Sequence, residues 1–167
     1  MSRRGYTLIE MVLVMFLLIL VSFYVFTLTG VGSSAYLRLT DWQNRTSDLR
    51  IGLSYIDVKV RSNDMADRIE IRPDPFSGND ALVIRRPVGE EAYLTWIYVY
   101  DGSLYELFVR ENAAVTPQMG NKIADADALQ LSLPAPQQLR VTLMSGTGDE
   151  IRSRTRTIGL NSGGVGP

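Results

Sequence analysis

An uncharged apolar run from Met11 to Leu28 constrains this chain more than any other feature. A helix rises about 1.5 Å per residue, so this run reaches roughly 27 Å as a helix, close to the thickness of a bilayer core. We therefore expect a transmembrane helix at residues 6–29. Arg3 and Arg4 stand just before it and no acid offsets them. The positive-inside rule then places the N-terminus in the cytoplasm and the rest of the chain outside the cytoplasmic membrane.

One carboxylate, that of Glu10, stands at the start of the apolar run. A charge within a membrane is costly because water is scarce there, so this carboxylate needs a positive partner. We expect that partner to come from another copy of the same helix. The alternative is a carboxylate that reaches the membrane interface and is solvated there.

The composition excludes several classes of function. The 167 residues suit one domain with an anchor. The chain has no Cys and no His, which removes disulfides, Cys or His nucleophiles, His general bases and nearly all zinc sites. The net charge of −1 is no general signature of polyanion binding. We therefore expect no enzymatic activity, no cofactor and no metal site.

Residues 30–62 predict an amphipathic continuation of the helix, which would form a stalk. Gly30 and Gly32 directly follow the apolar run, and glycine weakens a helix enough to allow a bend. Beyond them, mostly apolar residues recur at alternating steps of three and four, which is the helical period. These residues are Leu39, Trp42, Thr46, Leu49, Leu53, Ile56 and Val60. The stripe needs an apolar surface to pack on, and we expect the helix to end at Ser62-Asn63-Asp64.

From about Asp67 the apolar period changes to two, which indicates β-strands over residues 63–160. Asp101-Gly102 lies between two apolar runs and predicts a tight hairpin. We expect five to seven antiparallel strands and a disordered tail at residues 161–167. The fold class is then α+β, with the long N-terminal helix packed on an antiparallel β-sheet. The expected core comprises Trp42, Leu49, Leu53, Ile56, Ile69, Ile71, Leu82, Ile84, Leu104, Leu107, Leu131, Val141 and Leu143.

Arg152, Arg154 and Arg156 alternate along the last expected strand, so they share one face of it. A basic strip of this kind could bind nucleic acid. Charged residues also protect an exposed strand from pairing with other chains, and we favour this second interpretation. Nucleic acid is therefore only a weakly supported partner.

Asp125 and Asp127, with Asn121 nearby, offer hard oxygen ligands of the kind that bind calcium. Their spacing matches no defined calcium loop. A polar turn between strands is therefore the favoured interpretation of this segment.

Aromatic residues are dense between residues 93 and 108. They could form a face for a sugar or a peptide, but pairs across a hairpin are the more common role, and we favour it. The residues are Tyr93, Trp96, Tyr98, Tyr100, Tyr105 and Phe108.

The segment Gly5-Tyr6-Thr7-Leu8-Ile9-Glu10, followed by the apolar run, resembles the start of a class III prepilin. Such starts belong to the type IV pilin and type II secretion pseudopilin superfamily. The resemblance implies that residues 1–5 are a leader peptide, with its charge on Arg3 and Arg4. It also implies that prepilin peptidase cuts between Gly5 and Tyr6 and N-methylates Tyr6. Glu10 matches the assembly glutamate of the family, and Tyr6 replaces the usual Phe.

Cleavage at this position would leave an ammonium group on Tyr6, one helical turn from Glu10. Two unit charges about 4 Å apart attract by roughly 4 kcal/mol at an effective dielectric constant near 20. The amine of one subunit could then neutralise the Glu10 carboxylate of its neighbour in a helical filament.

The resemblance implies a pilin-like fold and a structural role as a minor pilin or pseudopilin in a pilus, competence or secretion filament. The later strands resemble those of minor pilins, mostly Gram-positive ones, more than those of a major pilin. The expected partners are other pilin-like subunits, prepilin peptidase, an inner-membrane assembly platform and membrane lipid. After assembly, the chain would lie in an extracellular or cell-surface filament. The alternative is a monomeric, single-pass, membrane-anchored extracellular binding protein.

Overall fold

The computed structural model describes residues 8–65, 68–146, 148 and 151–161, without the side chains of residues 28–44. The expected leader and cleavage site, residues 1–6, lie outside the described residues. So does the expected tail beyond Asn161.

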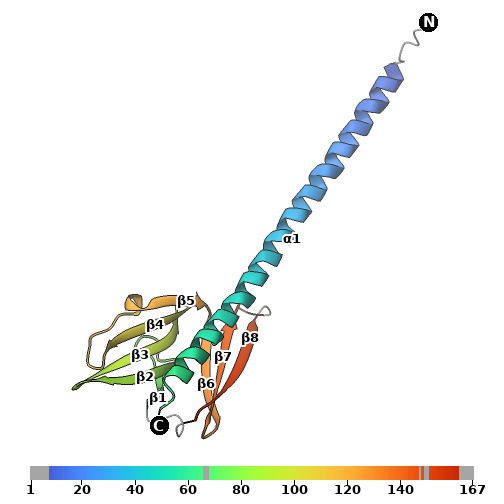
Figure 1. Ribbon diagram of the computed structural model, residues 1–167. Helices are drawn as coiled ribbons and strands as arrows, with labels where there is room; N and C mark the ends of the chain where they lie inside the picture. Colours follow the sequence, from blue (N-terminus) through green and yellow to red (C-terminus); the bar gives the residue numbers. More distant parts are fainter. Residues whose placement is uncertain (1–7, 66–67, 147, 149–150, 162–167) are drawn as a thin grey trace. The chain divides into compact units, whose positions relative to one another are not determined.

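The described chain contains one long α-helix, eight β-strands and a short 3-10 helix (Figure 1). In chain order they are α1 (Leu8–Ser62), β1 (Ile69–Pro73), β2 (Asp80–Val88), β3 (Glu91–Tyr100), β4 (Ser103–Arg110), η1 (Pro117–Met119), β5 (Asn121–Asp125), β6 (Ala128–Ala135), β7 (Gln138–Ser145) and β8 (Arg152–Gly159). The α+β fold class predicted from the sequence is confirmed, and α1 ends at Ser62, as expected.

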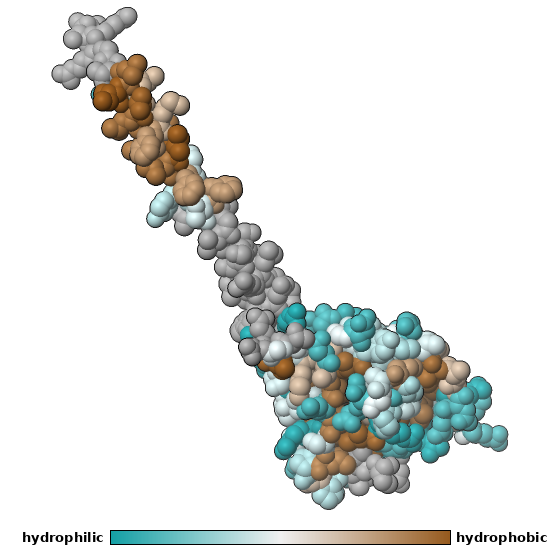
Figure 2. Space-filling view, turned by 180° about the vertical axis from the view of Figure 1, so that it is seen from behind, coloured by the Kyte–Doolittle hydropathy of each residue, from teal (hydrophilic) through white to brown (hydrophobic). Residues whose placement is uncertain are grey.

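The chain divides into two compact units, Met1–Gln43 and Asn44–Pro167. The described part of the first unit is helical. Within it, Leu8–Thr27 is 20 residues long and is apolar enough to cross a membrane. Its large apolar side chains from Leu8 to Phe26 are exposed, and those on the visible face form an apolar surface in Figure 2. A single-pass membrane anchor accounts for this exposed apolar surface.

The second unit combines residues 44–62 of α1 with two antiparallel sheets. The five-stranded sheet has the order β1-β2-β3-β4-β5, and the three-stranded sheet has the order β6-β7-β8. The expectation of five to seven strands in one sheet was therefore wrong. The sheets separate after β5, where the chain crosses over. The N–H of Ala126 donates to the carbonyl of Gly102 at 3.1 Å, and that of Asp127 donates to the carbonyl of Met144 at 2.8 Å. Ala126 is thus hydrogen-bonded to a hairpin of the five-stranded sheet, and the next residue, Asp127, is hydrogen-bonded to the three-stranded sheet.

The hairpin between β3 and β4 turns at the predicted Asp101-Gly102 pair. Both residues have positive φ angles, 45° at Asp101 and 70° at Gly102. Two consecutive residues with positive φ form the turn whose twist matches that of the flanking strands, and glycine adopts this conformation without a steric penalty.

The main core lies where α1 contacts the two sheets. The buried helical residues are Leu49, Leu53, Ile56 and Val60; they cluster with Leu82, Ile97 and Leu104 of the five-stranded sheet and with Leu139, Val141 and Leu143 of the three-stranded sheet. Burial of each such side chain contributes about 1.5–3 kcal/mol. The predicted core is confirmed except at two positions. Ile71 is only partly buried, and the side chain of Trp42 lies outside the described residues.

Gly52 allows α1 to approach the sheets closely. A Cβ atom at this position would lie 2.7 Å from Cδ1 of Leu143 and 3.1 Å from Cδ2 of Leu104. At Gly52 the helix thus lies close to both sheets, and a side chain at this position would prevent the close approach.

The opposite face of the five-stranded sheet carries a smaller core, formed by Ala81, Tyr98 and Leu107. The loop between β1 and β2 covers part of it with Phe76, whose ring centroid lies 5.1 Å from that of Tyr98. The hydroxyl of Tyr98 donates to the carbonyl of Pro117 at 3.0 Å. Burial raises the pKa of Tyr98 to about 12.

Candidate functional site

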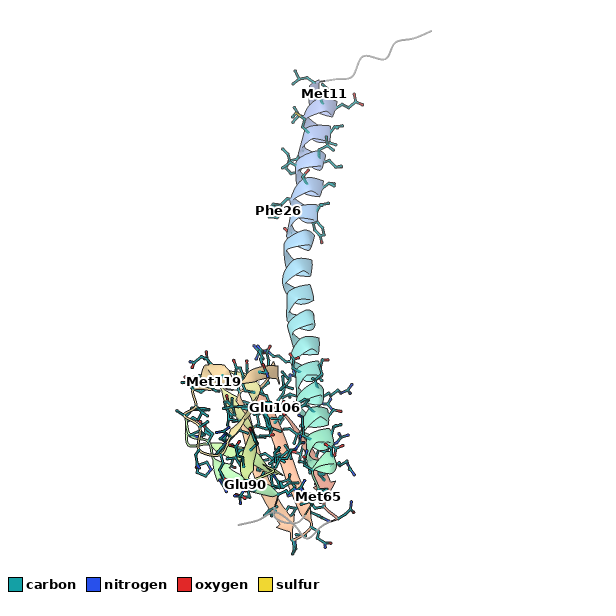
Figure 3. All side chains as sticks on the ribbon, turned by 60° about the vertical axis from the view of Figure 1, so that its left-hand side comes forward. Met11, Phe26, Met65, Glu90, Glu106 and Met119 are labelled. Atoms are coloured by element: carbon teal, nitrogen blue, oxygen red, sulfur yellow. The ribbon has the colours of Figure 1, made fainter. Side chains whose placement is uncertain are left out.

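The predicted assembly residue, Glu10, lies in the first turn of the described helix. Its side chain is exposed and has apolar neighbours, with Ile9 75% and Met11 65% exposed. The side chains between Met11 and Phe26 point away from the helix axis in all directions (Figure 3). Glu10 is the only Asp, Glu, Lys or Arg residue between Leu8 and Thr27.

This arrangement can attract and position a positive group. The N-terminal end of a helix carries a partial positive charge, which stabilises a nearby carboxylate by about 0.3–1 kcal/mol at an exposed site. That contribution is small against the cost of a carboxylate in hydrocarbon, about 2.5–3.5 kcal/mol on insertion scales. A full positive charge from another group is therefore needed once Glu10 lies within a membrane or a helix bundle. Arg3, Arg4, Gly5 and Tyr6 lie outside the described residues, so the predicted cleavage and methylation site stays a prediction.

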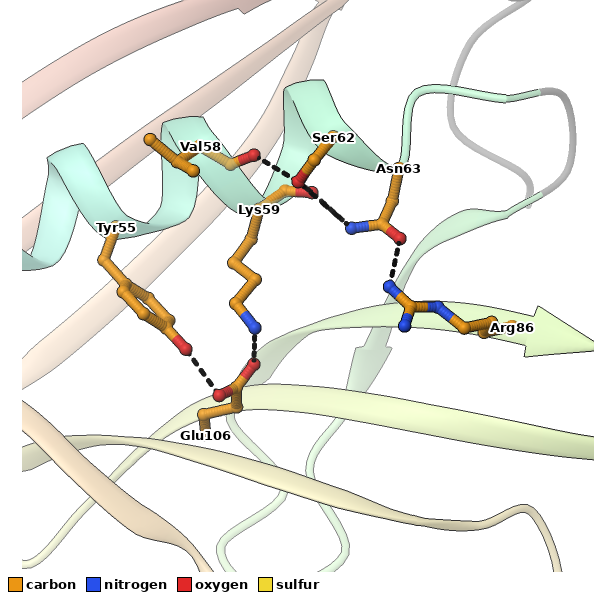
Figure 4. A network of polar contacts seen from close by, with 7 residues as sticks. All are labelled: Tyr55, Val58, Lys59, Ser62, Asn63, Arg86 and Glu106. Atoms are coloured by element: carbon orange, nitrogen blue, oxygen red, sulfur yellow. Dashed lines mark hydrogen bonds and ion pairs between the residues drawn. The ribbon is translucent and has the colours of Figure 1, made fainter.

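A second polar site joins α1 to the five-stranded sheet (Figure 4). Nζ of Lys59 lies 2.6 Å from Oε1 of Glu106, and the hydroxyl of Tyr55 donates to Oε2 of the same carboxylate. The side chain of Glu106 is 15% exposed and that of Lys59 is 34% exposed. The hydrogen bond to Glu106 raises the pKa of Lys59, and burial together with this carboxylate raises the pKa of Tyr55. Two residues one helical turn apart thus hold one nearly buried carboxylate.

The end of α1 is tied to β2 through Asn63. Its side-chain amide donates to the carbonyl of Lys59 at 2.8 Å, and its amide oxygen accepts a hydrogen bond from Arg86 at 3.0 Å. Carbonyls in the last turn of a helix lack partners within the helix, and Asn63 satisfies one of them. The same side chain thus ends the helix and binds it to the sheet (Figure 4).

The two carboxylates considered as calcium ligands, those of Asp125 and Asp127, each have a different partner. Asp125 accepts hydrogen bonds from Lys122 at 2.5 Å and Ser103 at 3.3 Å, and the hydrogen bond from Lys122 lowers the pKa of Asp125. Asp127 accepts a hydrogen bond from the N–H of Gly146 at 2.6 Å. No group of three acidic residues that could hold a metal ion occurs in the described part of the chain. The favoured interpretation, a polar connection between strands, accounts for both residues.

The structure divides the aromatic residues between two faces of the five-stranded sheet. Tyr98, Trp96, Tyr100 and Tyr105 belong to the smaller core or pack against it. Tyr93 and Phe108 stack on each other with ring centroids 5.3 Å apart, and Phe108 is 53% exposed. These contacts are pairs across the sheet and packing beneath a loop, which is the role that the sequence favoured.

Sequence reasoning missed the site at Glu106. Its signal is an acid within the apolar strand Leu104–Phe108, together with Tyr55 and Lys59 four residues apart on the flank of the helical stripe. Neither pattern alone names the partner, because residues 55 and 106 meet only after the sheet has packed on the helix.

The fold and the site define an α+β protein whose N-terminal helix can cross a membrane. The profile of a family described as a domain of unknown function, DUF4860, matches residues 47–145, which is more than half of the chain. The chain therefore belongs to the DUF4860 family. The match covers the part of α1 that packs on the sheets and the strands through β7, and it excludes the apolar helix with Glu10. Comparisons with curated proteins and with solved structures gave no significant match.

Proposed function

We propose that the chain is a pilin-like structural subunit, a minor pilin or pseudopilin, that is processed after Gly5 and assembled into a filament. The observation that carries this proposal is the position of Glu10. It is the one ionisable carboxylate in a membrane-length helix whose described apolar side chains are all exposed. A helix of this kind needs two partners in succession, first lipid and then other helices.

Assembly into a filament would satisfy both needs. Before assembly the apolar helix would anchor the chain in the cytoplasmic membrane, with the second unit outside. In the filament, the helices of neighbouring subunits would cover its apolar surface. The new amino group at Tyr6 of one subunit would neutralise Glu10 of the next. The role is structural rather than catalytic, and the partners are other pilin-like subunits, prepilin peptidase and the inner-membrane assembly platform.

The second unit is held firmly on its own part of α1. The helical stripe from Leu49 to Val60 is buried against two sheets, and Glu106 and Arg86 bind the last turns of α1 through polar contacts. A pull on residues 49–60 of α1 would therefore reach the sheets through buried packing.

Mass spectrometry of the mature N-terminus tests this proposal. The full chain is expressed with a prepilin peptidase, and the expected terminus is N-methyl-Tyr6. Gly5→Leu should leave the leader attached, while Glu90→Ala, a change on an exposed hairpin of the second unit, should be processed normally. A wild-type chain that keeps Met1, or begins far downstream of Tyr6, would contradict the proposal and would favour a monomeric membrane-anchored protein.

A further inference from the structure

The edge of the three-stranded sheet carries a basic ladder, defined by Arg152, Arg154 and Arg156 of β8, and all three are exposed. Arg154 lies opposite Leu143 and Arg156 lies opposite Val141 in the register of β7 and β8. Residues directly opposite each other share a face of the sheet, so the ladder lies on the face that α1 packs against. Its members repeat about every 6.6 Å along a strand that has a partner on one side only.

Asp57 of α1 lies beside the ladder and is shared by two arginines. Asp57 of α1 binds Arg156 at 3.4 Å through one oxygen and Arg61 at 3.0 Å through the other. No ion pair of Arg154 occurs within the described residues. Arg154 is therefore the member of the ladder that a carboxylate from another chain can approach.

An acidic cleft lies at the other edge of the same sheet, between β6 and the five-stranded sheet. It has a volume of about 360 Å³, and its lining includes Asp80 and Asp127, the amide residues Asn79 and Gln130, and the apolar Val99 and Leu129. Asp80 accepts a hydrogen bond from the N–H of Leu131 at 3.4 Å. Like Asp127, it has no ion pair within the described residues. The cleft thus presents two exposed carboxylates whose hydrogen bonds, within the described part of the chain, come from backbone N–H groups.

We infer that the basic ladder of one copy of this chain docks in the acidic cleft of the next copy. This inference rests on the proposed function, because it describes a contact between subunits of the filament. Guanidinium groups bind carboxylates through two parallel hydrogen bonds, so Arg154 facing Asp80 and Asp127 is a chemically matched contact. Charge complementarity selects a second copy as the occupant, because the two matching surfaces belong to the same chain.

The positions of the basic ladder and the acidic cleft determine the symmetry of the assembly that this contact forms. The cleft borders β6 and the ladder lies on β8, two strand spacings or about 10 Å apart across the sheet. Different surfaces meet in this contact, so it is not two-fold symmetric. Each bound copy leaves one ladder and one cleft unoccupied, and the contact extends into an open chain of subunits rather than closing as a dimer.

Cross-linking tests the contact directly, because the natural chain contains no Cys. The full-length double variant Asp80→Cys/Arg154→Cys is expressed with the assembly machinery and mildly oxidised. We expect a series of covalent oligomers of increasing size on a non-reducing gel. The matched control is Asp80→Cys/Arg140→Cys. Arg140 is also an exposed arginine of the same sheet, but it lies between the buried Leu139 and Val141 and so points to the opposite face. The control should remain monomeric.

Three results would overturn the contact. They are no cross-linking of the Arg154 pair, equal cross-linking of the Arg140 pair, or products that stop at the dimer. If the chain is present in sheared filaments and carries a mature N-terminus but does not cross-link, only this contact is wrong. If the chain is unprocessed and absent from filaments, the proposed function itself is wrong.

Charge reversal provides an independent test. Arg154→Glu should reduce recovery of the chain in sheared filaments at least tenfold, and Asp80→Arg should do the same. The chain that carries both changes should regain at least half of the wild-type recovery, because the charges are exchanged rather than lost. Arg140→Glu should assemble like the wild type, and circular dichroism checks that every variant is folded. A double variant no better than the single variants would contradict the contact.

Discussion

Lys59 of α1 and Glu106 of β4 are joined by an ion pair, with 2.6 Å between Nζ and Oε1, although 47 positions separate them in the sequence (106 − 59). Tyr55 donates to the second oxygen of the same carboxylate. The helix and the five-stranded sheet are thus connected by a polar contact within an otherwise apolar junction. Such a contact fixes the position of the helix, because it is satisfied in only one arrangement of the two elements.

Glu106→Ala should therefore destabilise the second unit. The change leaves the Tyr55 hydroxyl and the Lys59 ammonium without their acceptor in a partly buried site, and we expect a loss of about 1–3 kcal/mol in the free energy of unfolding. Urea denaturation of the full chain in detergent, followed by near-ultraviolet circular dichroism, measures it. Glu90→Ala, on an exposed hairpin, should change the free energy by less than about 0.5 kcal/mol. Equal effects of the two changes would show that the ion pair contributes nothing specific.

Gly52→Leu should separate α1 from the sheets. Even a Cβ atom at position 52 would lie only 2.7 Å from Cδ1 of Leu143, whose side chain is fully buried, so the surrounding core would have to shift. Overpacking of this kind costs about 1–3 kcal/mol or more, beyond the gain of about 1 kcal/mol from replacing glycine in a helix. Ser54→Leu, on the exposed side of the same helix, is the control and should be nearly neutral. The melting temperatures of the two variants give the comparison, and similar values would contradict the close approach.

Asp74 should make the stability of the second unit depend on pH in the acid range. Burial by itself would raise the pKa of this carboxyl. Hydrogen bonds from the hydroxyl and N–H of Ser77 and from the N–H groups of Phe76 and Asn79 outweigh burial and lower the pKa. The folded state thus binds a proton less readily than the unfolded state, whose pKa is about 4. The stabilisation is present above about pH 4 and is lost as the pH falls through the lower, folded pKa.

The measurement for Asp74 is the difference in unfolding free energy between the wild type and Asp74→Ala. We expect about 1–3 kcal/mol at neutral pH, because four hydrogen bonds to one buried residue are removed, and a smaller difference below pH 4. Ser77→Ala removes only the hydroxyl donor and should give a smaller loss with the same dependence on pH. A difference that stays constant or grows on acidification would show that Asp74 is not held as a carboxylate.

Glu10→Ala should separate processing from assembly. The change removes the carboxylate but leaves Gly5 and the apolar helix intact, so the leader should still be removed. Incorporation into sheared filaments should fall at least tenfold, since two unit charges about 4 Å apart attract by roughly 4 kcal/mol at an effective dielectric constant near 20. Glu10→Asp keeps the charge on a shorter side chain and should retain part of the assembly. Normal incorporation of Glu10→Ala would remove the main support for the proposed function.

Much of the fold could be predicted from local patterns. The uncharged run after Glu10 indicated a membrane helix, the stripe from Leu49 to Val60 indicated the buried side of α1, and Asp101-Gly102 marked a hairpin that the structure confirms. The division into two sheets could not be predicted in this way. It depends on the crossover at Ala126 and Asp127, whose N–H groups bond to Gly102 and Met144, carbonyls distant in the sequence.

The sequence by itself determined the apolar anchor, the periods of helix and strand, and the single carboxylate at the start of the anchor, because each depends on residues within a few positions of one another. Only the tertiary structure decided that Glu106 meets Lys59, that Gly52 lies against Leu143, and that β8 and the Asp80 cleft occupy opposite edges of one sheet. Contacts of this kind arise when distant segments pack together. Charge and hydropathy along the chain specify which groups need a partner, but not which partner they meet.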